Sequence, residues 1–228
     1  MTGTGAGVPP PSKDALSTPR AAGLAGILFG LLLGTAIVLV RVAVPEQPTS
    51  AGSWLTDSSR RATVQVALDL VPFAGIAFLW FLAAVRDRIG EREDRFFATV
   101  FIGSGLVFTA VLLGAAAAAG GMLATAGEAG GKLWDFGHSI VYSLLTEYSM
   151  RMAAVFAFCT STIARRLHVL PRALVWLGWL VGLVLIVGAG TVAWLELAFP
   201  VWSVLLGGYL LGATQTTSGA STVSARYR

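Results

Sequence analysis

Charged side chains are scarce in this sequence. Only 12% of the 228 residues are Asp, Glu, Lys or Arg, while 55% are hydrophobic. Soluble domains carry about a quarter charged residues. The few charges stand in short groups between long uncharged runs, which is the pattern of transmembrane helices. The composition therefore excludes an ordinary soluble domain and predicts an integral membrane protein.

Cysteine and the common catalytic motifs are also missing or nearly so. Cys159 is the single cysteine, which excludes an intrachain disulfide and a cysteine metal cluster. Glycine-rich phosphate loops, His-Glu-x-x-His, Cys-x-x-Cys and nucleophile-elbow sequences do not occur. Asp69 is the only aspartate inside an expected span, which argues against a paired-aspartate intramembrane protease. We therefore expect no enzyme activity, no cofactor and no metal site.

Long apolar runs are what the sequence does contain. A helix needs about 20 apolar residues to cross a bilayer, and the runs predict an all-α bundle of about six transmembrane helices. The expected spans lie near residues 21–40, 62–85, 96–124, 138–164, 173–193 and 200–213. They form one membrane domain over residues 21–214, between an N-terminal segment, 1–20, and a tail, 215–228, both expected to be disordered. Whether the short sixth span crosses fully is left open.

The basic residues predict the orientation in the membrane. Most of the sixteen Lys and Arg residues fall before the first span, after the second and fourth spans, or in the tail. Loops rich in Lys and Arg stay on the cytoplasmic side, so both termini are expected in the cytoplasm of a multi-pass protein. The same loops account for the net charge of +4, and we expect the bilayer rather than nucleic acid as the partner.

Small residues recur at helical spacing in the first span. Gly26, Gly30 and Gly34 repeat every four residues and so share one helix face. Such a face lets a neighbouring helix approach closely. We favour packing within one chain, and we leave a homo-oligomer open.

Four polar residues inside the expected spans form the candidate site. Glu147 and Arg151 lie four positions apart, as do Gln65 and Asp69, so each pair shares a helix face. An ionised side chain near mid-bilayer costs about 2.5–3.5 kcal/mol on insertion scales. We therefore expect Asp69, Glu147 and Arg151 to meet in a buried cluster, with Gln65 beside it.

Three functions fit a buried polar cluster of this kind. A structural or accessory membrane component would use the charges only to fix helix register. A small transporter or proton-coupled permease would use them to bind its ion or small-molecule substrate, and six helices would then have to act as an oligomer. A membrane enzyme acting on lipid has no motif to support it. We favour the first function and retain the second as the alternative.

Two neighbouring segments carry a resemblance to a known family. Residues 70–81 combine Pro72 with a run of large apolar side chains, and residues 86–97 form a loop of alternating charge. Together they resemble a family of small bacterial integral membrane proteins of the domain-of-unknown-function kind. The resemblance implies a multi-helix protein of the bacterial cytoplasmic membrane and brings no activity, cofactor or catalytic residue with it.

Overall fold

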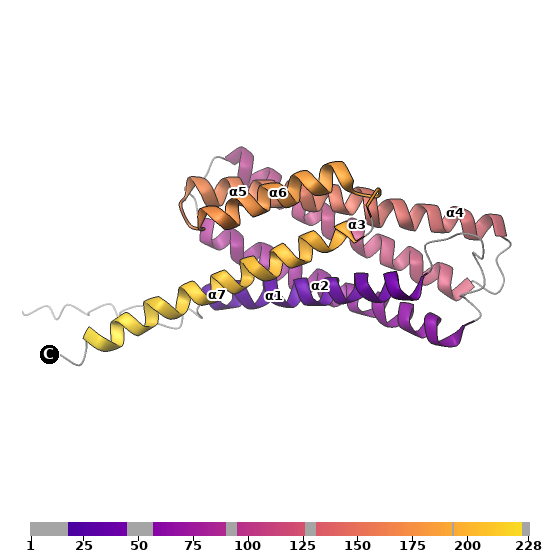
Figure 1. Cartoon of the computed structure of the whole chain (residues 1–228), viewed down its shortest axis with the longest axis horizontal. Helices are drawn as coiled ribbons and strands as arrows, with labels where there is room; N and C mark the ends of the chain where they lie inside the picture. Colours follow the sequence, from indigo (N-terminus) through magenta and orange to yellow (C-terminus); the bar gives the residue numbers. More distant parts are fainter. Residues whose placement is uncertain (1–17, 45–56, 90–94, 126–130, 193, 225–228) are drawn as a thin grey trace, which may run out of the picture.

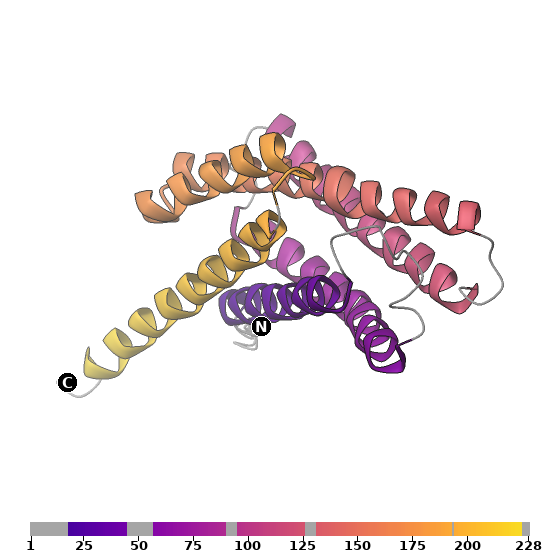
Figure 2. The same cartoon turned by 45° about the vertical axis from the view of Figure 1, so that its right-hand side comes forward.

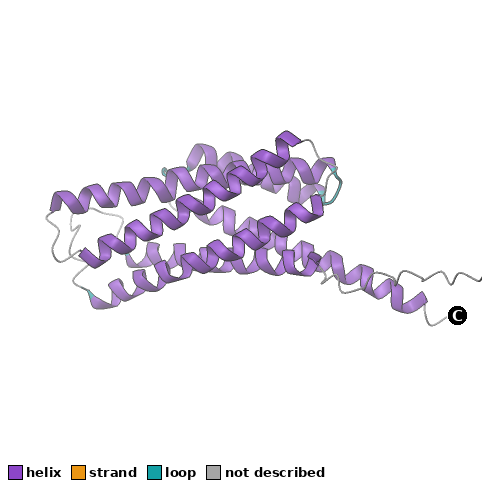
Figure 3. Ribbon diagram, turned by 180° about the vertical axis from the view of Figure 1, so that it is seen from behind, coloured by secondary structure: helices purple, strands orange, loops and turns teal. Residues whose placement is uncertain are grey.

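The chain folds into a bundle of long helices. The computed structural model describes residues 18–44, 57–89, 95–125, 131–192 and 194–224. The elements in chain order are α1 (Thr18–Ala43), α2 (Ser58–Ile89), α3 (Arg95–Thr125), α4 (Gly131–Tyr142), the π-helix η4 (Ser143–Ser149), α5 (Met150–Arg166), α6 (Arg172–Gly188), the 3-10 helix η5 (Leu195–Leu197) and α7 (Ala198–Ser224). No strand occurs in these ranges (Figure 3), so the predicted all-α class is confirmed. Of the segments expected to be disordered, 1–20 and 215–228, residues 1–17 and 225–228 lie outside the described residues, whereas 18–20 and 215–224 are helical, as the ends of α1 and α7.

Four of the helices are long and apolar enough to cross a bilayer. They are Ala21–Ala43, Ser58–Asp87, Phe96–Thr125 and Leu195–Ala213. The fourth expected span is continuous helix from α4 through η4 to α5, but it carries Glu147 and Arg151. The fifth, α6, has 17 residues and so rises about 26 Å, a little less than a hydrocarbon core of about 30 Å. Embedding in a membrane is thus supported by four helices, while six complete crossings stay a prediction.

The helices run alternately in opposite directions along one long axis, with α4, η4 and α5 together forming one of them (Figure 1). α1 packs against α2 and α7, α5 packs against α6, and α3 contacts α2, η4 and α5. After a 45° turn, Figure 2 shows two groups of helices as layers, one of α4, α5 and α6 and the other of α1 and α2. The first described residues of α1 and the last of α7 lie at the same end of the bundle. At the opposite end, α2, α3 and α4 project beyond α1 and α6.

Phenylalanine rings fill the interior where the two groups meet. Fully or almost fully buried rings come from α1, α2, α3, α5 and α7: Phe29, Phe78, Phe81, Phe101, Phe108, Phe156 and Phe199. The ring centroid of Phe78 lies 4.8 Å from that of Phe29, 4.9 Å from Phe108 and 5.1 Å from Phe156. Aromatic pairs at such distances contribute about 0.5–1.5 kcal/mol beyond the area that they bury. Phe78 is therefore the point at which four helices are joined.

The glycine face of α1 packs inside the chain, as the sequence favours. A Cβ built at Gly26 would lie closest to the Phe81 ring and 3.4 Å from Gly207 Cα. A Cβ built at Gly30 would lie 2.6 Å from Val204 Cγ2. These contacts leave no room for a side chain, because the backbones of α1 and α7 nearly touch. Gly34, at the end of the stripe, meets only the Pro200 side chain, at 3.8 Å.

Candidate functional site

An ion pair joins the end of α1 to the connection between α6 and α7. Nη2 of Arg41 donates to Oε1 of Glu196 at 2.7 Å and to Oε2 at 2.9 Å. The Glu196 side chain is 8% exposed and that of Arg41 is 21% exposed. Charge-assisted hydrogen bonds this short are about twice as strong as neutral ones. The pair therefore fastens two segments that lie 155 positions apart in the sequence.

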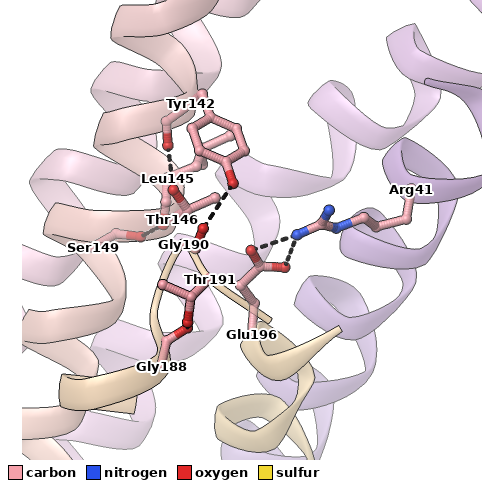
Figure 4. Close-up of polar contacts among 9 residues, drawn as sticks. All are labelled: Arg41, Tyr142, Leu145, Thr146, Ser149, Gly188, Gly190, Thr191 and Glu196. Atoms are coloured by element: carbon pink, nitrogen blue, oxygen red, sulfur yellow. Dashed lines mark hydrogen bonds and ion pairs between the residues drawn. The ribbon is translucent and has the colours of Figure 1, made fainter. Parts of the chain in front are cut away.

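The backbone around Glu196 is held in an unusual conformation. α6 ends at Gly188, and Gly190 and Trp194 both adopt positive φ angles, of 81° and 69°. A left-handed conformation at a residue other than glycine costs on the order of 1–3 kcal/mol. The hydroxyl of Tyr142 donates to the Gly190 carbonyl at 3.2 Å, and the Thr191 hydroxyl donates to the Gly188 carbonyl at 2.9 Å (Figure 4). The Tyr142 bond holds the connection against α4, and the Thr191 bond closes the turn after α6.

The same connection lies against the π-helix η4. A Cβ built at Gly190 would lie 3.6 Å from Glu147 Cγ and 3.7 Å from Thr146 Oγ1. Most π-helices are single-turn insertions and are frequent at functional sites, so a run of seven residues from Ser143 to Ser149 is long. The Thr146 hydroxyl donates to the Tyr142 carbonyl at 2.8 Å, which satisfies one acceptor in this widened turn.

These contacts together form one polar group at the end of α1 and α6. Its members are Arg41, Tyr142, Thr146, Glu147, Gly190 and Glu196. Arg41 lies near the end of α1 and Gly190 just after the end of α6, and beyond that level α2, α3 and α4 continue (Figure 1). The expected spans do not predict this polar group, because Arg41 falls just after the first span and Glu196 falls between the fifth and the sixth. The available signal was that Glu196 is the only acid between residues 173 and 214, so a buried Glu196 needed a basic partner.

The structure brings the four predicted site residues together only in pairs. Nη1 of Arg151 lies 3.2 Å from Oε2 of Glu147, so that predicted contact forms. Nε2 of Gln65 donates to Oδ1 of Asp69 at 3.0 Å. No ion pair joins Asp69 to Arg151 in the described part of the chain. The expected three-residue cluster is therefore not formed.

The two pairs also lie on the outside of the bundle instead of inside it. The side chains of Arg151 and Glu147 are 45% and 42% exposed, and Gln65 and Asp69 are exposed. The physical reason on α2 is its register: Val64, Ala67 and Val71 face the bundle, which turns the neighbouring polar face outward. Buried phenylalanines take the interior volume that the cluster was expected to fill.

Two buried polar side-chain atoms of the described residues have no hydrogen-bond partner. They are Oγ of Ser161 on α5 and Nε1 of Trp202 on α7. Both point at Gly178 of α6, since a Cβ there would overlap the Ser161 hydroxyl and lie 2.9 Å from Trp202 Nε1. Gly178 therefore allows α5, α6 and α7 to meet closely around these two groups.

Two crevices among the described residues are small or peripheral. One of about 30 Å³ lies between α5 and α7 and is lined by Thr160, Ile163, Leu206 and Leu210 among others. That volume holds about one water molecule. The other, of about 250 Å³, lies between the ends of α3 and α4, next to Met122, Trp134 and Ile140. Neither crevice is lined by a charged side chain.

No protein-family model, curated protein or solved structure matches this chain. The resemblance carried by residues 70–81 and 86–97 therefore stays a prediction.

Proposed function

We propose that this chain is a structural or accessory component of a membrane, without enzymatic activity, and that its charges hold helices in place. The observation that carries this proposal is the Arg41–Glu196 ion pair. It is the most buried ion pair in the described residues, and it ties α1 to the start of α7. The packed phenylalanines behind it leave the interior apolar. Both features favour a rigid scaffold.

The proposed setting is the bacterial cytoplasmic membrane, with both termini in the cytoplasm. The described ends of α1 and α7 lie at one end of the bundle, which supports placing both termini on the same side; the basic loops favour the cytoplasmic side. Single cysteines placed in a Cys159→Ala background test it with a membrane-impermeant thiol reagent. Labelling from outside is expected at Ser53→Cys and Thr125→Cys but not at Ser12→Cys or Ser221→Cys. The reverse pattern would overturn the orientation.

A small transporter is the second candidate, and one observation favours it. Glu147 lies in the π-helix η4 and next to the broken connection at Gly190, and unwound segments near charged groups form the binding sites of many transporters. An exposed carboxylate in such a segment could bind a proton or a cation.

Reconstitution into liposomes distinguishes the two candidates. We expect no flux driven by a pH or ion gradient above that of empty liposomes, and no difference between the parent protein and Glu147→Gln. A gradient-driven flux that Glu147→Gln abolishes, while Glu93→Gln in the charged segment 86–97 of the sequence leaves it intact, would establish the transporter instead. The two variants are matched because each neutralises one carboxylate.

A further inference from the structure

Two arginines flank a pair of tryptophans where α5 ends and α6 begins. The guanidinium carbon of Arg165 lies 5.3 Å from the centroid of the Trp179 ring. The Trp179 ring meets that of Trp176 edge to face, with the centroids 5.1 Å apart. Nε1 of Trp179 donates to the Thr162 hydroxyl of α5 at 3.2 Å, which holds this ring in place. Arg172 begins α6 one helical turn before Trp176, so all four side chains lie together on the α5–α6 pair.

The two guanidinium groups belong to the same level of the bundle. α5 and α6 pack side by side (Figure 1), and they are antiparallel, with Gly178 against Ser161 and Gly182 against Ala154. Arg165 follows Ser161 by four positions and is therefore level with residue 174, about 3 Å along the axis from Arg172. Both arginine side chains are exposed, and neither forms an ion pair in the described part of the chain.

A stripe of exposed apolar side chains continues from Arg172 along α6. Its members follow one another at intervals of three or four residues: Trp176, Leu180, Leu183 and Val187. That spacing keeps them on the helix face of Arg172. The rise from Arg172 to Leu183 is about 17 Å, close to the 15 Å or so of hydrocarbon in one leaflet. The face therefore carries positive charge at one end and an apolar strip as deep as one leaflet.

We propose that an anionic phospholipid binds this face, with its phosphate between Arg165 and Arg172 and an acyl chain along Trp176, Leu180 and Leu183. Guanidinium groups form paired, charge-assisted hydrogen bonds with phosphate oxygens. Stacking on Trp179 restricts Arg165 before the lipid arrives, which lowers the entropy cost of binding. A zwitterionic headgroup would bring its own cation to two unpaired arginines, so charge complementarity selects an anionic lipid.

The corresponding end of α2 shows what distinguishes this face. Arg86 and Trp80 are exposed there, so α2 also offers one arginine and one tryptophan to lipid. Asp87 directly follows Arg86 and offsets its charge, and no guanidinium of the described residues lies over Trp80. α2 thus supplies matched control positions. The lipid site uses neither Arg41 nor Glu196, so it does not depend on the function proposed above.

Thermal unfolding of the full chain in a neutral detergent tests the site, because a ligand that binds the folded state raises the melting temperature. We expect phosphatidylglycerol to raise it saturably and at lower concentration than phosphatidylcholine does. Inorganic phosphate at constant ionic strength should give no shift, since it lacks the acyl chain. Equal responses to the two lipids would indicate unselective lipid contact, and a shift with phosphate would indicate a soluble anion. A dimer in light scattering that responds to neither lipid would give the face to a second copy. Each of these three results overturns the proposal.

Paired variants locate the site on α6. Arg172→Gln should raise the phosphatidylglycerol concentration for half of the shift about tenfold, as expected for one lost charge-assisted hydrogen bond. Trp176→Ala should raise it several-fold. Arg86→Gln and Trp80→Ala remove the same groups from α2 and should leave it unchanged; all four positions are exposed, so the variants should fold. If Arg86→Gln weakens the response as much as Arg172→Gln, the lipid is attracted by the basic end as a whole, and the site on α6 is wrong.

Discussion

Both oxygens of the Glu196 carboxylate accept hydrogen bonds from Nη2 of the Arg41 guanidinium, which joins the end of α1 to η5, directly before α7. The contact lies at the same end of two helices whose middles are joined by glycine packing at Gly26 and Gly207. α1 and α7 are thus held at two levels, by close backbone approach and by charge. That combination fixes both the distance between the helices and their relative height.

Arg41→Leu should destabilise the protein strongly, because it leaves the buried Glu196 carboxylate without a partner. Breaking a buried pair costs about 3–5 kcal/mol, and the partial exposure of Arg41 places the expected loss at the lower end. Equilibrium unfolding in mixed detergent micelles measures it. Arg60→Leu is the control, since its pair with Asp57 is nearly half exposed and should be worth at most about 1 kcal/mol. Equal losses in the two variants would show that Glu196 is solvated.

Gly30→Ala should lower the melting temperature in detergent, since the added methyl group would lie 2.6 Å from Val204 Cγ2. The rigid backbone of α7 cannot move away without losing its contact with α1. Gly208→Ala is the matched control on α7, because nothing lies within 4 Å of a Cβ there. Alanine is favoured over glycine in a helix by about 1 kcal/mol, so the control should melt at the same temperature or slightly higher. A loss at Gly208 as large as that at Gly30 would contradict the packing.

Phe78→Ala should cost about 3–5 kcal/mol of unfolding free energy, as is usual for phenylalanine in a packed core. The ring is fully buried and lies within 5.1 Å of the rings of Phe29, Phe108 and Phe156. Phe73→Ala on the exposed face of α2 removes the same atoms from a lipid-facing position and should have little effect. The same unfolding assay in micelles compares the two, and a larger loss at Phe73 would place that face in an interface.

The sequence predicts the fold because hydrophobicity and length decide it. Uncharged runs located the helices α1, α2 and α3 closely, and the glycine spacing in α1 correctly indicated packing within the chain. They located the start of α7 but not its end, because the helix continues to Ser224 through polar residues expected to be a disordered tail. The candidate site was harder, since periodicity tells which residues share a face but not which face is buried. Gln65 with Asp69 and Glu147 with Arg151 did share faces, yet both faces point outward. The Arg41–Glu196 pair could not be placed by local pattern, because its partners lie 155 positions apart.

The last prediction concerns the unpartnered hydroxyl of Ser161. Ser161→Ala should leave stability unchanged or raise it by about 1–3 kcal/mol, because an unsatisfied buried polar group carries a desolvation cost of that size. Ser203→Ala is the matched control, since the Ser203 hydroxyl is equally buried but donates to the Phe199 carbonyl at 3.0 Å. Removing that bonded hydroxyl should be neutral or destabilising. Unfolding in micelles gives both values.

Gly178 links this hydroxyl to the packing of α6, which allows a sharper test. Gly178→Ala alone should destabilise, because its methyl group would overlap the Ser161 hydroxyl and crowd Trp202 Nε1. Adding Ser161→Ala removes the atom that is overlapped, so the double variant should recover a large part of the loss. Residues in contact show such non-additivity, typically of about 0.5–3 kcal/mol, whereas independent sites add. If the effects of the two changes on stability are simply additive, the Ser161 hydroxyl does not lie against Gly178. That result would contradict the close packing of α5, α6 and α7 around Gly178.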